Sequence, residues 1–353
     1  MTRIGNVNIA GRAIGPGLPT YIIAELSANH NQNFEKAERI LRAAKNAGAD
    51  AVKLQTYTAD TITLRSDNEF FQIHGGTLWD GRTLHDLYQE AFTPWDWQPK
   101  LKKIAEDLGM HLFSSAFDGS AVDFLEQMDV PAHKVASCEL VDLGLIRKMA
   151  RTGKPMIMST GMASEDEISE AMTAAREAGA TQIALLKCTS AYPALPEEAN
   201  LLTIPELARR FDCPAGLSDH TMGVAVPIAA VALGACIVEK HLCLRRVDGG
   251  PDNAFSLEPQ EFKAMVDAVR VAEKALGSVQ FTPSPSEINS RRFRRSLFVV
   301  EDVKRDELFT ARNIRSIRPA DGLHPRHFQE ILGKRAAHDV ERGTPLSWTL
   351  VSQ

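Results

Sequence analysis

The sequence predicts a (β/α)8 barrel, the TIM-barrel class of α/β fold, followed by a small second domain. Over roughly the first 280 residues, eight short apolar runs of strand length alternate with longer segments of helical periodicity. Eight such repeats over about 250 residues are typical of this barrel. A doubly wound open sheet is the alternative, but that fold favours a glycine-rich turn after the first strand, and "AELSANHNQ" is not glycine-rich.

Each predicted strand is an apolar run bounded by polar or turn-forming residues. The eight strands are expected at 21–25, 51–55, 111–116, 133–137, 155–160, 183–188, 214–219 and 236–242. The segments between them are amphipathic, and two of them, 33–48 and 164–179, end in glycine, the usual residue at a helix C-terminus. Ser164, with Glu167 three residues later, predicts a capping box at the start of the second of these helices.

Two segments interrupt the alternation. Residues 57–94 are an insertion that carries Phe, Trp and Tyr, and we expect an ordered wall or lid over the barrel mouth, because long loops in compact domains are usually functional or disordered. After Gly277 the long helical segments stop, and prolines, serines and the basic cluster "RRFRR" (291–295) follow. We therefore expect a barrel domain at 1–280, a linker at 281–294 and a small domain at 295–353. The basic cluster is expected to be solvated, with docking of one domain on another as the alternative.

Composition limits the class of protein. The 353 residues are 44% hydrophobic and carry a net charge of −5, which disfavours a nucleic-acid partner. Five cysteines without CxxC spacing predict neither a disulfide framework nor a structural zinc site, and favour a reducing cytoplasm. The N-terminus lacks the pattern of a signal peptide. The most apolar run, 224–238, is too short to span a bilayer, so we expect a buried helix followed by a strand there, and no membrane partner.

Polar side chains stand at or just after the end of every predicted strand. A core-filling strand has no use for them, because each buried unpaired polar atom costs about 1–3 kcal/mol. Since barrel enzymes keep their sites at the carboxyl ends of the strands, these residues predict a site. In strand order they are Glu25, Asn29 and His30; Lys53 and Gln55; Ser114 and Ser115; Lys134 and Ser137; Ser159 and Thr160; Lys187 and Ser190; Ser218, Asp219 and His220; Glu239, Lys240 and His241.

The residue types at these strand ends indicate an anionic ligand and a metal. Lysines on the second, fourth, sixth and eighth strands, interleaved with serines, suit phosphate or carboxylate. His220 and His241 come from neighbouring strands, which lie about 4.8 Å apart, so their rings are able to share one ion. With Glu25 from the first strand they make a nitrogen and oxygen set suited to Mn²⁺, Zn²⁺ or Fe²⁺.

Each of these residues also has a structural interpretation. A single histidine at a strand end is more often a hydrogen-bonded structural group than a metal ligand. For Lys187 the alternative is an ordinary surface cation. Cys188 has no evident histidine partner in the sequence, which favours a core residue over a nucleophile. The remaining histidines considered are expected to be structural or surface residues: His30, His74, His85, His111 and His133.

The chain resembles a known family over nearly its whole length. The segments that carry the resemblance, in order, are "IIAELSANHNQ", "AGADAVKLQTYT", "HKVASCEL", "MIMSTGM", "KCTSAYP", "GLSDHT", "VEKHLCL" and "GGPDNAFSLEPQEF". They are similar to the nonulosonic (sialic) acid synthases, and "RRSLFVVEDVKRDE" and "IRPADGLHP" resemble the C-terminal SAF, or antifreeze-like, domain of that family. "SANHNQ" and "KLQ" differ from the "GxNHxG" and "KFQ" typical of N-acetylneuraminate and legionaminate synthases. They indicate a different branch, with those two activities as the alternatives.

The resemblance implies a reaction and a site. The family joins phosphoenolpyruvate to an open-chain amino sugar with a divalent metal, usually Mn²⁺, with Mg²⁺ or Co²⁺ as other possibilities. His220 and His241 would hold the metal, with Asp219 orienting an imidazole, and Glu25 would be the acid/base. The residues implied to hold phosphoenolpyruvate are Lys53, Ser115, Lys134, Ser137, Ser159, Ser190 and Ser218.

The resemblance also implies which residues bind the sugar. Asp252 and Tyr192 would face it, Gln55 is a further substrate-binding candidate, and Arg318 would reach it from the SAF domain of the partner in a domain-swapped homodimer. Ser190 and Ser115 depart from the family, where Asn and a Thr-Pro pair are common, but both retain a hydrogen-bond donor. A non-catalytic sugar-binding protein is the alternative from another class, and it leaves the lysines and serines unexplained.

Overall fold

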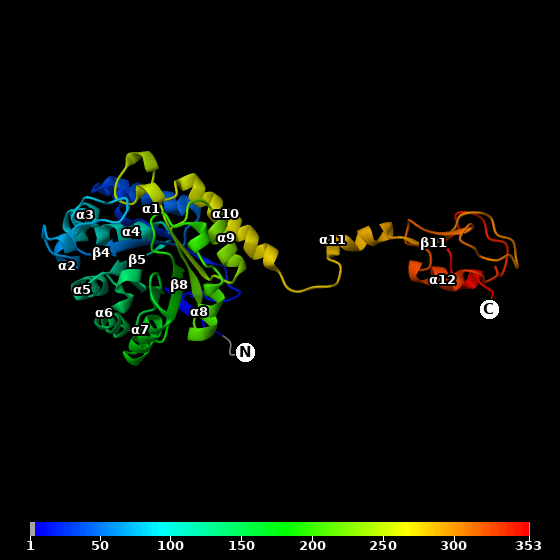
Figure 1. The fold of residues 1–353 in the computed structure, drawn as a ribbon, viewed down its shortest axis with the longest axis horizontal. Helices are drawn as coiled ribbons and strands as arrows, with labels where there is room; N and C mark the ends of the chain where they lie inside the picture. Colours follow the sequence, from blue (N-terminus) through cyan, green and yellow to red (C-terminus); the bar gives the residue numbers. More distant parts are fainter. Residues whose placement is uncertain (1–3, 353) are drawn as a thin grey trace. The chain divides into compact units, whose positions relative to one another are not determined.

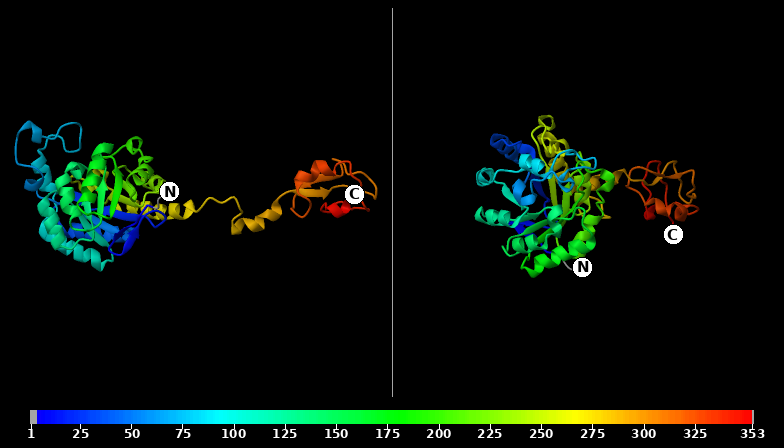
Figure 2. Two further views of the ribbon diagram at one scale, coloured as in Figure 1. Left: turned by 90° about the horizontal axis from the view of Figure 1, so that it is seen from below. Right: turned by 60° about the vertical axis from the view of Figure 1, so that its left-hand side comes forward.

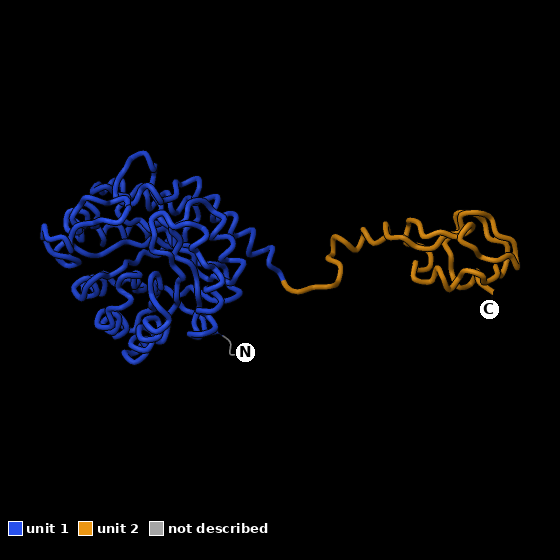
Figure 3. The backbone as a smooth tube through the Cα atoms, in the orientation of Figure 1, with its two compact units in different colours: residues 1–277 blue, residues 278–353 orange. Residues whose placement is uncertain are grey.

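The computed structural model describes residues 4–352, which form two compact units divided between Gly277 and Ser278 (Figure 3). Among the described residues, no helix is both long enough and apolar enough to cross a membrane.

The first unit contains a closed barrel of parallel strands, in the order β10-β3-β4-β5-β6-β7-β8-β9 (Figure 1). This confirms the predicted fold class, and each predicted strand lies within two residues of the observed one. The strands are β3 Tyr21–Glu25, β4 Ala51–Thr56, β5 His111–Ala116, β6 His133–Val135, β7 Met156–Ser159, β8 Ile183–Cys188, β9 Ala215–Asp219 and β10 Ile237–His241.

Helices surround the strands of this unit (Figure 2). The predicted capping box is formed at α7, where Ser164 N donates to Glu167 Oε2 (2.7 Å) and Glu167 N donates to Ser164 Oγ (3.3 Å). The run 224–238 forms a helix followed by a strand, as expected. The main helices are α1 Phe34–Ala47, α4 Gln98–Asp107, α5 Gly119–Gln127, α6 Leu143–Ala150, α7 Glu165–Glu177, α8 Thr203–Phe211, α9 Ala225–Ala232 and α10 Pro259–Leu276.

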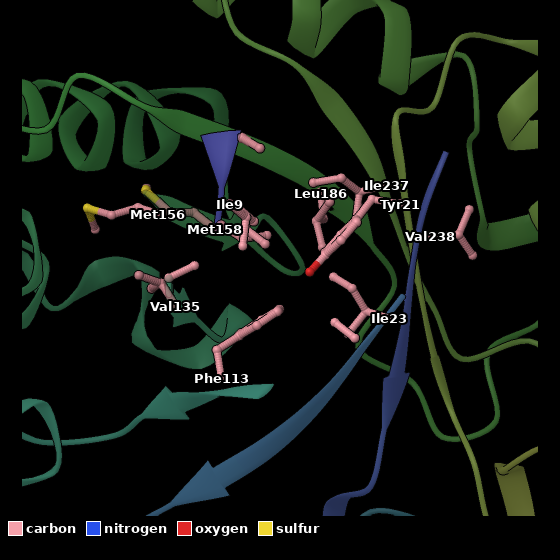
Figure 4. Packing of buried hydrophobic residues seen from close by; sticks show 14 of the residues in the cluster. Ile9, Tyr21, Ile23, Phe113, Val135, Met156, Met158, Leu186, Ile237 and Val238 are labelled. Carbon is pink, nitrogen blue, oxygen red and sulfur yellow. The ribbon is translucent and has the colours of Figure 1, made fainter. Parts of the chain in front are cut away.

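The barrel interior is apolar towards the amino ends of the strands. Successive side chains of a strand point to opposite faces, so every second residue enters the interior and the others pack under the helices. Figure 4 shows Val238 directed away from its neighbour Ile237. The residues that converge on the interior in this view are Tyr21, Ile23, Phe113, Leu186 and Ile237.

A short antiparallel hairpin precedes the barrel and was not predicted. It consists of β1 Val7–Ile9 and β2 Arg12–Ile14, and its residues Ile9 and Ile14 are fully buried. Figure 4 shows Ile9 among the barrel side chains. Strands of three residues carry too little periodicity to be recognised from sequence.

The insertion at 57–94 contains two short helices, α2 Ala59–Ile62 and α3 Leu84–Ala91. Its Trp79 reaches the loops of the barrel mouth, where Nε1 donates to Pro251 O (2.9 Å) and the ring packs on Tyr192 at 5.6 Å between centroids. The amide of Gln32, in the loop after β3, donates to the carbonyls of Glu90 (2.9 Å) and Phe92 (2.6 Å), which fastens the end of α3.

The second unit has a small apolar core of its own. Its regular elements are α11 Pro285–Ile288, β11 Ser296–Val299, β12 Ile314–Ile317 and α12 Phe328–Ile331, and β11 pairs with β12 antiparallel. The buried core residues include Leu297, Val299, Phe309, Ile314, Ile331 and Leu346.

Candidate active site

The barrel strands bring polar side chains together at their carboxyl ends. In the observed register Glu25 pairs with Lys53, Gln55 with Ser115, and Ser115 with Lys134. Across the other part of the barrel His241 pairs with Glu25, and Glu239 with Ser218. Paired residues of parallel strands project to the same face, so this set shares the interior with the apolar residues below it.

A buried cluster of opposite charges lies at the centre of this end. Lys53 Nζ is 2.6 Å from Glu25 Oε2 and 2.7 Å from Glu239 Oε1, and Ser218 Oγ donates to Glu239 Oε1 at 3.0 Å. Lys134 Nζ lies 4.0 Å from Glu239. Burial opposes ionisation of Glu239, but Lys134 and Lys53 overcome it and hold its pKa well below the usual range. Burial lowers the pKa of Lys53 to about 8, against the attraction of Glu239.

Hydroxyl groups surround Lys134. Its ammonium donates to Ser159 Oγ (2.7 Å) and Val135 O (2.9 Å). Gly161 N donates to Ser137 Oγ (3.2 Å), and a Cβ placed on Gly161 would lie 2.7 Å from Ser137 Oγ and still closer to Ser190 Oγ. Ser115 Oγ is buried and has no hydrogen-bond partner among the described residues. Ammonium and hydroxyl donors converging in this way suit a phosphate or carboxylate.

The two histidines face each other at the same end, with 5.3 Å between ring centroids. The Nδ1 of His220 lies 2.9 Å from Thr189 O, while the buried Nδ1 of His241 has no hydrogen-bond partner among the described residues. Burial, then the nearby His220, Lys53 and Lys240, lower the pKa of His241 well below 6.5, so its imidazole is neutral, the form that binds metals. Two neighbouring imidazoles, one oriented by a carbonyl, fit a divalent metal ion.

Several expectations about neighbouring residues are wrong. Lys187 and Lys240 do not join the interior cluster. Lys240 forms an ion pair with Asp219 at 2.5 Å, and Lys187 donates to Cys188 O (2.7 Å). Both side chains point away from the barrel interior, because each residue is next to one that faces the interior and successive side chains of a strand alternate between the two faces. Asp219 contacts Lys240 and Thr221 and does not orient an imidazole.

Two further expectations are corrected by contacts. Cys188 does have a histidine partner, since its Sγ lies 3.8 Å from His220 Nδ1. Glu25 is not a third metal ligand: its Oε2 faces Lys53, its Oε1 accepts from Ser27 N (3.1 Å), and residues 4–352 contain no group of three or more His, Cys, Asp or Glu side chains arranged to hold a metal.

Aromatic rings form a wall beside the histidines. Tyr192 packs on His220 with 4.5 Å between centroids and on Phe255 with 5.0 Å, and Phe255 packs on His241 at 4.9 Å. Trp79 of the insertion extends this wall through its contact with Tyr192. The expected histidines outside the site have structural partners: His30 with Thr93, His85 with Asp60, His111 with Tyr21 and His133 with Glu126.

Asp252 and Gln55 meet at Ser27. Ser27 Oγ donates to Asp252 Oδ2 and accepts from Gln55 Nε2 (3.1 Å). Arg318 follows β12 in the second unit and is exposed.

Sequence reasoning placed Glu239 among the polar strand ends but gave it no role, although it stands two residues before His241 and therefore shares its face. Trp79 was anticipated only as part of the aromatic insertion. Ser27, Phe255 and Gly161 were not included among the site residues, and they have no signal in the sequence because their roles depend on tertiary contacts.

The fold and these side chains define a barrel enzyme whose mouth suits an anionic ligand beside a pair of imidazoles. The NeuB family model matches residues 40–281, and the SAF domain model matches residues 294–352. The chain belongs to the NeuB family.

The chain is similar to curated proteins and to solved structures over most of its length. Pseudaminic acid synthase of Campylobacter jejuni subsp. jejuni serotype O:23/36 is 44% identical over 344 residues, 98% of both chains. Pseudaminic acid synthase of Helicobacter pylori is 46% identical and covers 93% of this chain and 97% of that one. The crystal structure of N-acetylneuraminic acid synthetase from Leptospira borgpetersenii, in complex with citrate, has a TM-score of 0.72 and 29% identity, and covers 81% of this chain and 94% of that one.

Proposed function

We propose that this protein is a pseudaminic acid synthase, a transferase that condenses phosphoenolpyruvate with 2,4-diacetamido-2,4,6-trideoxy-L-altrose and water to give pseudaminate and phosphate. The observation that carries the proposal is the buried Lys53–Glu239–Lys134 cluster, hydrogen-bonded by the Ser159 and Ser218 hydroxyls, at the same end of the barrel as His220 and His241. Relatives of 44% and 46% identity that carry this activity support the choice of sugar.

Phosphoenolpyruvate binds through the ammonium and hydroxyl donors. Lys53 and Lys134 neutralise the carboxylate and the phosphate of phosphoenolpyruvate. Their charges hold this anionic substrate beside the aldehyde that it attacks. The hydroxyl donors are Ser115, Ser137, Ser159, Ser190 and Ser218.

His220 and His241 hold a divalent metal, with Mn²⁺ the first choice and Mg²⁺ or Co²⁺ the others. When bound, the ion supplies Lewis-acid polarisation of the sugar aldehyde. Tyr192 and Phe255 pack against both imidazoles and limit the access of water to them.

Glu25 moves protons during the reaction. The C3 of phosphoenolpyruvate forms the new bond to the aldehyde carbon as its C2–C3 double bond opens, and the aldehyde oxygen takes a proton from Glu25 and becomes a hydroxyl. Water adds at C2 and returns a proton to Glu25. The C2–O bond to phosphate then breaks, and phosphate leaves with the proton of the C2 hydroxyl as the ketone forms. Ser27 N and Lys53 hold the Glu25 carboxylate in place through its two oxygens.

The sugar lies against Tyr192, Asp252 and Gln55. Arg318 of the partner subunit binds the same sugar in a domain-swapped homodimer. This agrees with the exposure of Arg318 and with its position in a unit that has its own apolar core. Five free cysteines agree with a reaction in the cytoplasm.

Phosphate release with different sugars tests the proposal. The protein is incubated with phosphoenolpyruvate, Mn²⁺ and either the L-altrose sugar or the manno-configured sugars that lead to legionaminate and N-acetylneuraminate. We expect the highest kcat/KM with the L-altrose sugar. A preference for a manno-configured sugar would replace the proposal by one of these two activities, and sugar binding indifferent to phosphoenolpyruvate and metal would indicate a receptor.

A further inference from the structure

Ser27 has a backbone conformation that favours glycine, Asn and Asp over other residues. Its φ is +48°, in the left-handed region, and it is 1% exposed. A Cβ in this region is strained, and such residues cluster where the surrounding structure requires them. A glycine would take the same backbone without this cost, which directs attention to the contacts of the Ser27 side chain.

The Ser27 hydroxyl joins two residues that are distant in sequence. It donates to Asp252 Oδ2, which also accepts from Ala28 N at 3.2 Å, and it accepts from Gln55 Nε2 at 3.1 Å. Three segments therefore meet at one hydroxyl: the end of β3, the strand β4 and the loop after β10.

The direction of these hydrogen bonds fixes which atoms remain free. Because the single hydroxyl proton of Ser27 is given to the carboxylate, its oxygen accepts from Gln55, and the Gln55 amide turns its nitrogen towards Ser27. Asp252 Oδ1 and Gln55 Oε1 are left without a hydrogen bond to any residue from 4 to 352. Two acceptor oxygens of this kind suit the hydroxyl and acetamido N–H donors of an amino sugar.

We propose that Ser27 is a positioning residue that sets the choice of sugar, by holding the Asp252 carboxylate and the Gln55 amide so that one acceptor oxygen of each faces the substrate. The proposal rests on the proposed function in taking the substrate as an acetamido sugar. The Ser27 hydroxyl is occupied by Asp252 and Gln55, so we assign it a positioning role and no role in the chemical step.

Two substitutions separate the hydroxyl from the backbone. Ser27→Gly removes the hydroxyl and relieves the strain, while Ser27→Ala removes the hydroxyl and keeps the strain. We expect both to raise the KM for the sugar by about ten- to a hundredfold, the loss typical of a hydrogen bond to a charged group. The KM for phosphoenolpyruvate should stay within about twofold of the wild type, because Lys53 and Lys134 are untouched. The preference for the L-altrose sugar over manno-configured sugars should fall.

Thermal unfolding distinguishes this role from a structural one. Ser27→Gly should unfold at the same temperature as the wild type or higher, and Ser27→Ala no higher than Ser27→Gly. Asp212→Gly is the matched control, because Asp212 also has a left-handed backbone, with φ +49°, but it follows α8 at the amino end of β9, away from the site. It should leave the sugar preference unchanged.

A double-mutant cycle with Asp252→Asn tests whether Ser27 acts through Asp252. In that background Ser27→Gly should change the sugar KM by much less than it does alone. An unchanged sugar KM and preference in both Ser27 variants, or full additivity with Asp252→Asn, overturns the proposal. All variants are measured with the sugar that the wild type prefers. If that sugar is manno-configured, the proposed function is refuted, but the comparison of the Ser27 variants with the wild type still tests the positioning role.

Discussion

Lys53 Nζ lies 2.7 Å from Glu239 Oε1 and 2.6 Å from Glu25 Oε2, within a barrel interior where all three side chains are buried. A cation between two carboxylates is held in place before any substrate binds. The nearby Lys134 gives Glu239 a second cation, so the anionic substrate meets two lysines whose charges are already positioned.

If Lys53 binds phosphoenolpyruvate as proposed, we expect the use of this substrate to depend on pH through the charge of Lys53. Burial lowers its pKa to about 8, so the ammonium is present below pH 8 and is lost as the pH rises above it. We expect kcat/KM for phosphoenolpyruvate to fall by about tenfold per pH unit on the alkaline side. A pH profile from 6.5 to 9.5 measures this.

Lys53→Arg is the control for that profile, because a guanidinium stays charged over this range. It should be less active than the wild type but lack the alkaline decrease near pH 8. If the variant shows the same decrease, another group is responsible.

We expect metal binding to depend on both His220 and His241. Chelation should abolish product formation, and Mn²⁺ should restore it. His220→Ala and His241→Ala should each lose Mn²⁺ binding measured by calorimetry, and metal-dependent turnover with it, while far-UV circular dichroism stays that of a folded barrel. Full activity with added Mn²⁺ in either variant would rule out the pair as ligands.

Gly161 keeps space for two hydroxyls. In Gly161→Ala the new Cβ would lie 2.7 Å from Ser137 Oγ and closer still to Ser190 Oγ, so both hydroxyls must move. We expect the KM for phosphoenolpyruvate to rise by about tenfold or more, with a smaller effect on the KM for the sugar. Gly5→Ala is a control at a glycine that has open space around it and no positive φ. Equal KM values for phosphoenolpyruvate in Gly161→Ala and the wild type would place this substrate elsewhere.

A shared site predicts complementation between two inactive variants. Glu25→Gln lacks the acid/base and Arg318→Ala lacks the arginine, so each homodimer should be nearly inactive. In a heterodimer with swapped domains, the intact Glu25 of one subunit meets the intact Arg318 of the other, which restores one of two sites and about half of the wild-type activity. Co-expression with two different tags yields the heterodimer for assay. No recovery would mean that Arg318 acts within its own subunit or not at all.

Much of the fold follows from local patterns. The alternation of apolar strands with amphipathic helices predicted all eight barrel strands within two residues, because burial on both faces leaves a recognisable apolar run. The hairpin β1–β2 was not predicted, since three-residue strands have no such signature.

The sequence predicted only part of the site, because it did not show which strand-end side chains face the barrel interior. The strand ends carry the polar residues in sequence, but Lys187 and Lys240 lie one residue out of phase with the interior. One residue of difference sends a side chain to the other face, where Lys240 pairs with Asp219. The position of Glu239 between two lysines requires the closed barrel, which brings β10 to within reach of β4 and β6.

The sequence by itself determined the class of fold, the strands and the set of polar side chains at their carboxyl ends, because these depend on the spacing of neighbouring residues. Only the tertiary structure decided which of these side chains meet. Ser27 and Asp252 are 225 residues apart, and their hydrogen bond exists because the strand β3 closes the barrel against β10 and carries the loops of both to the same place.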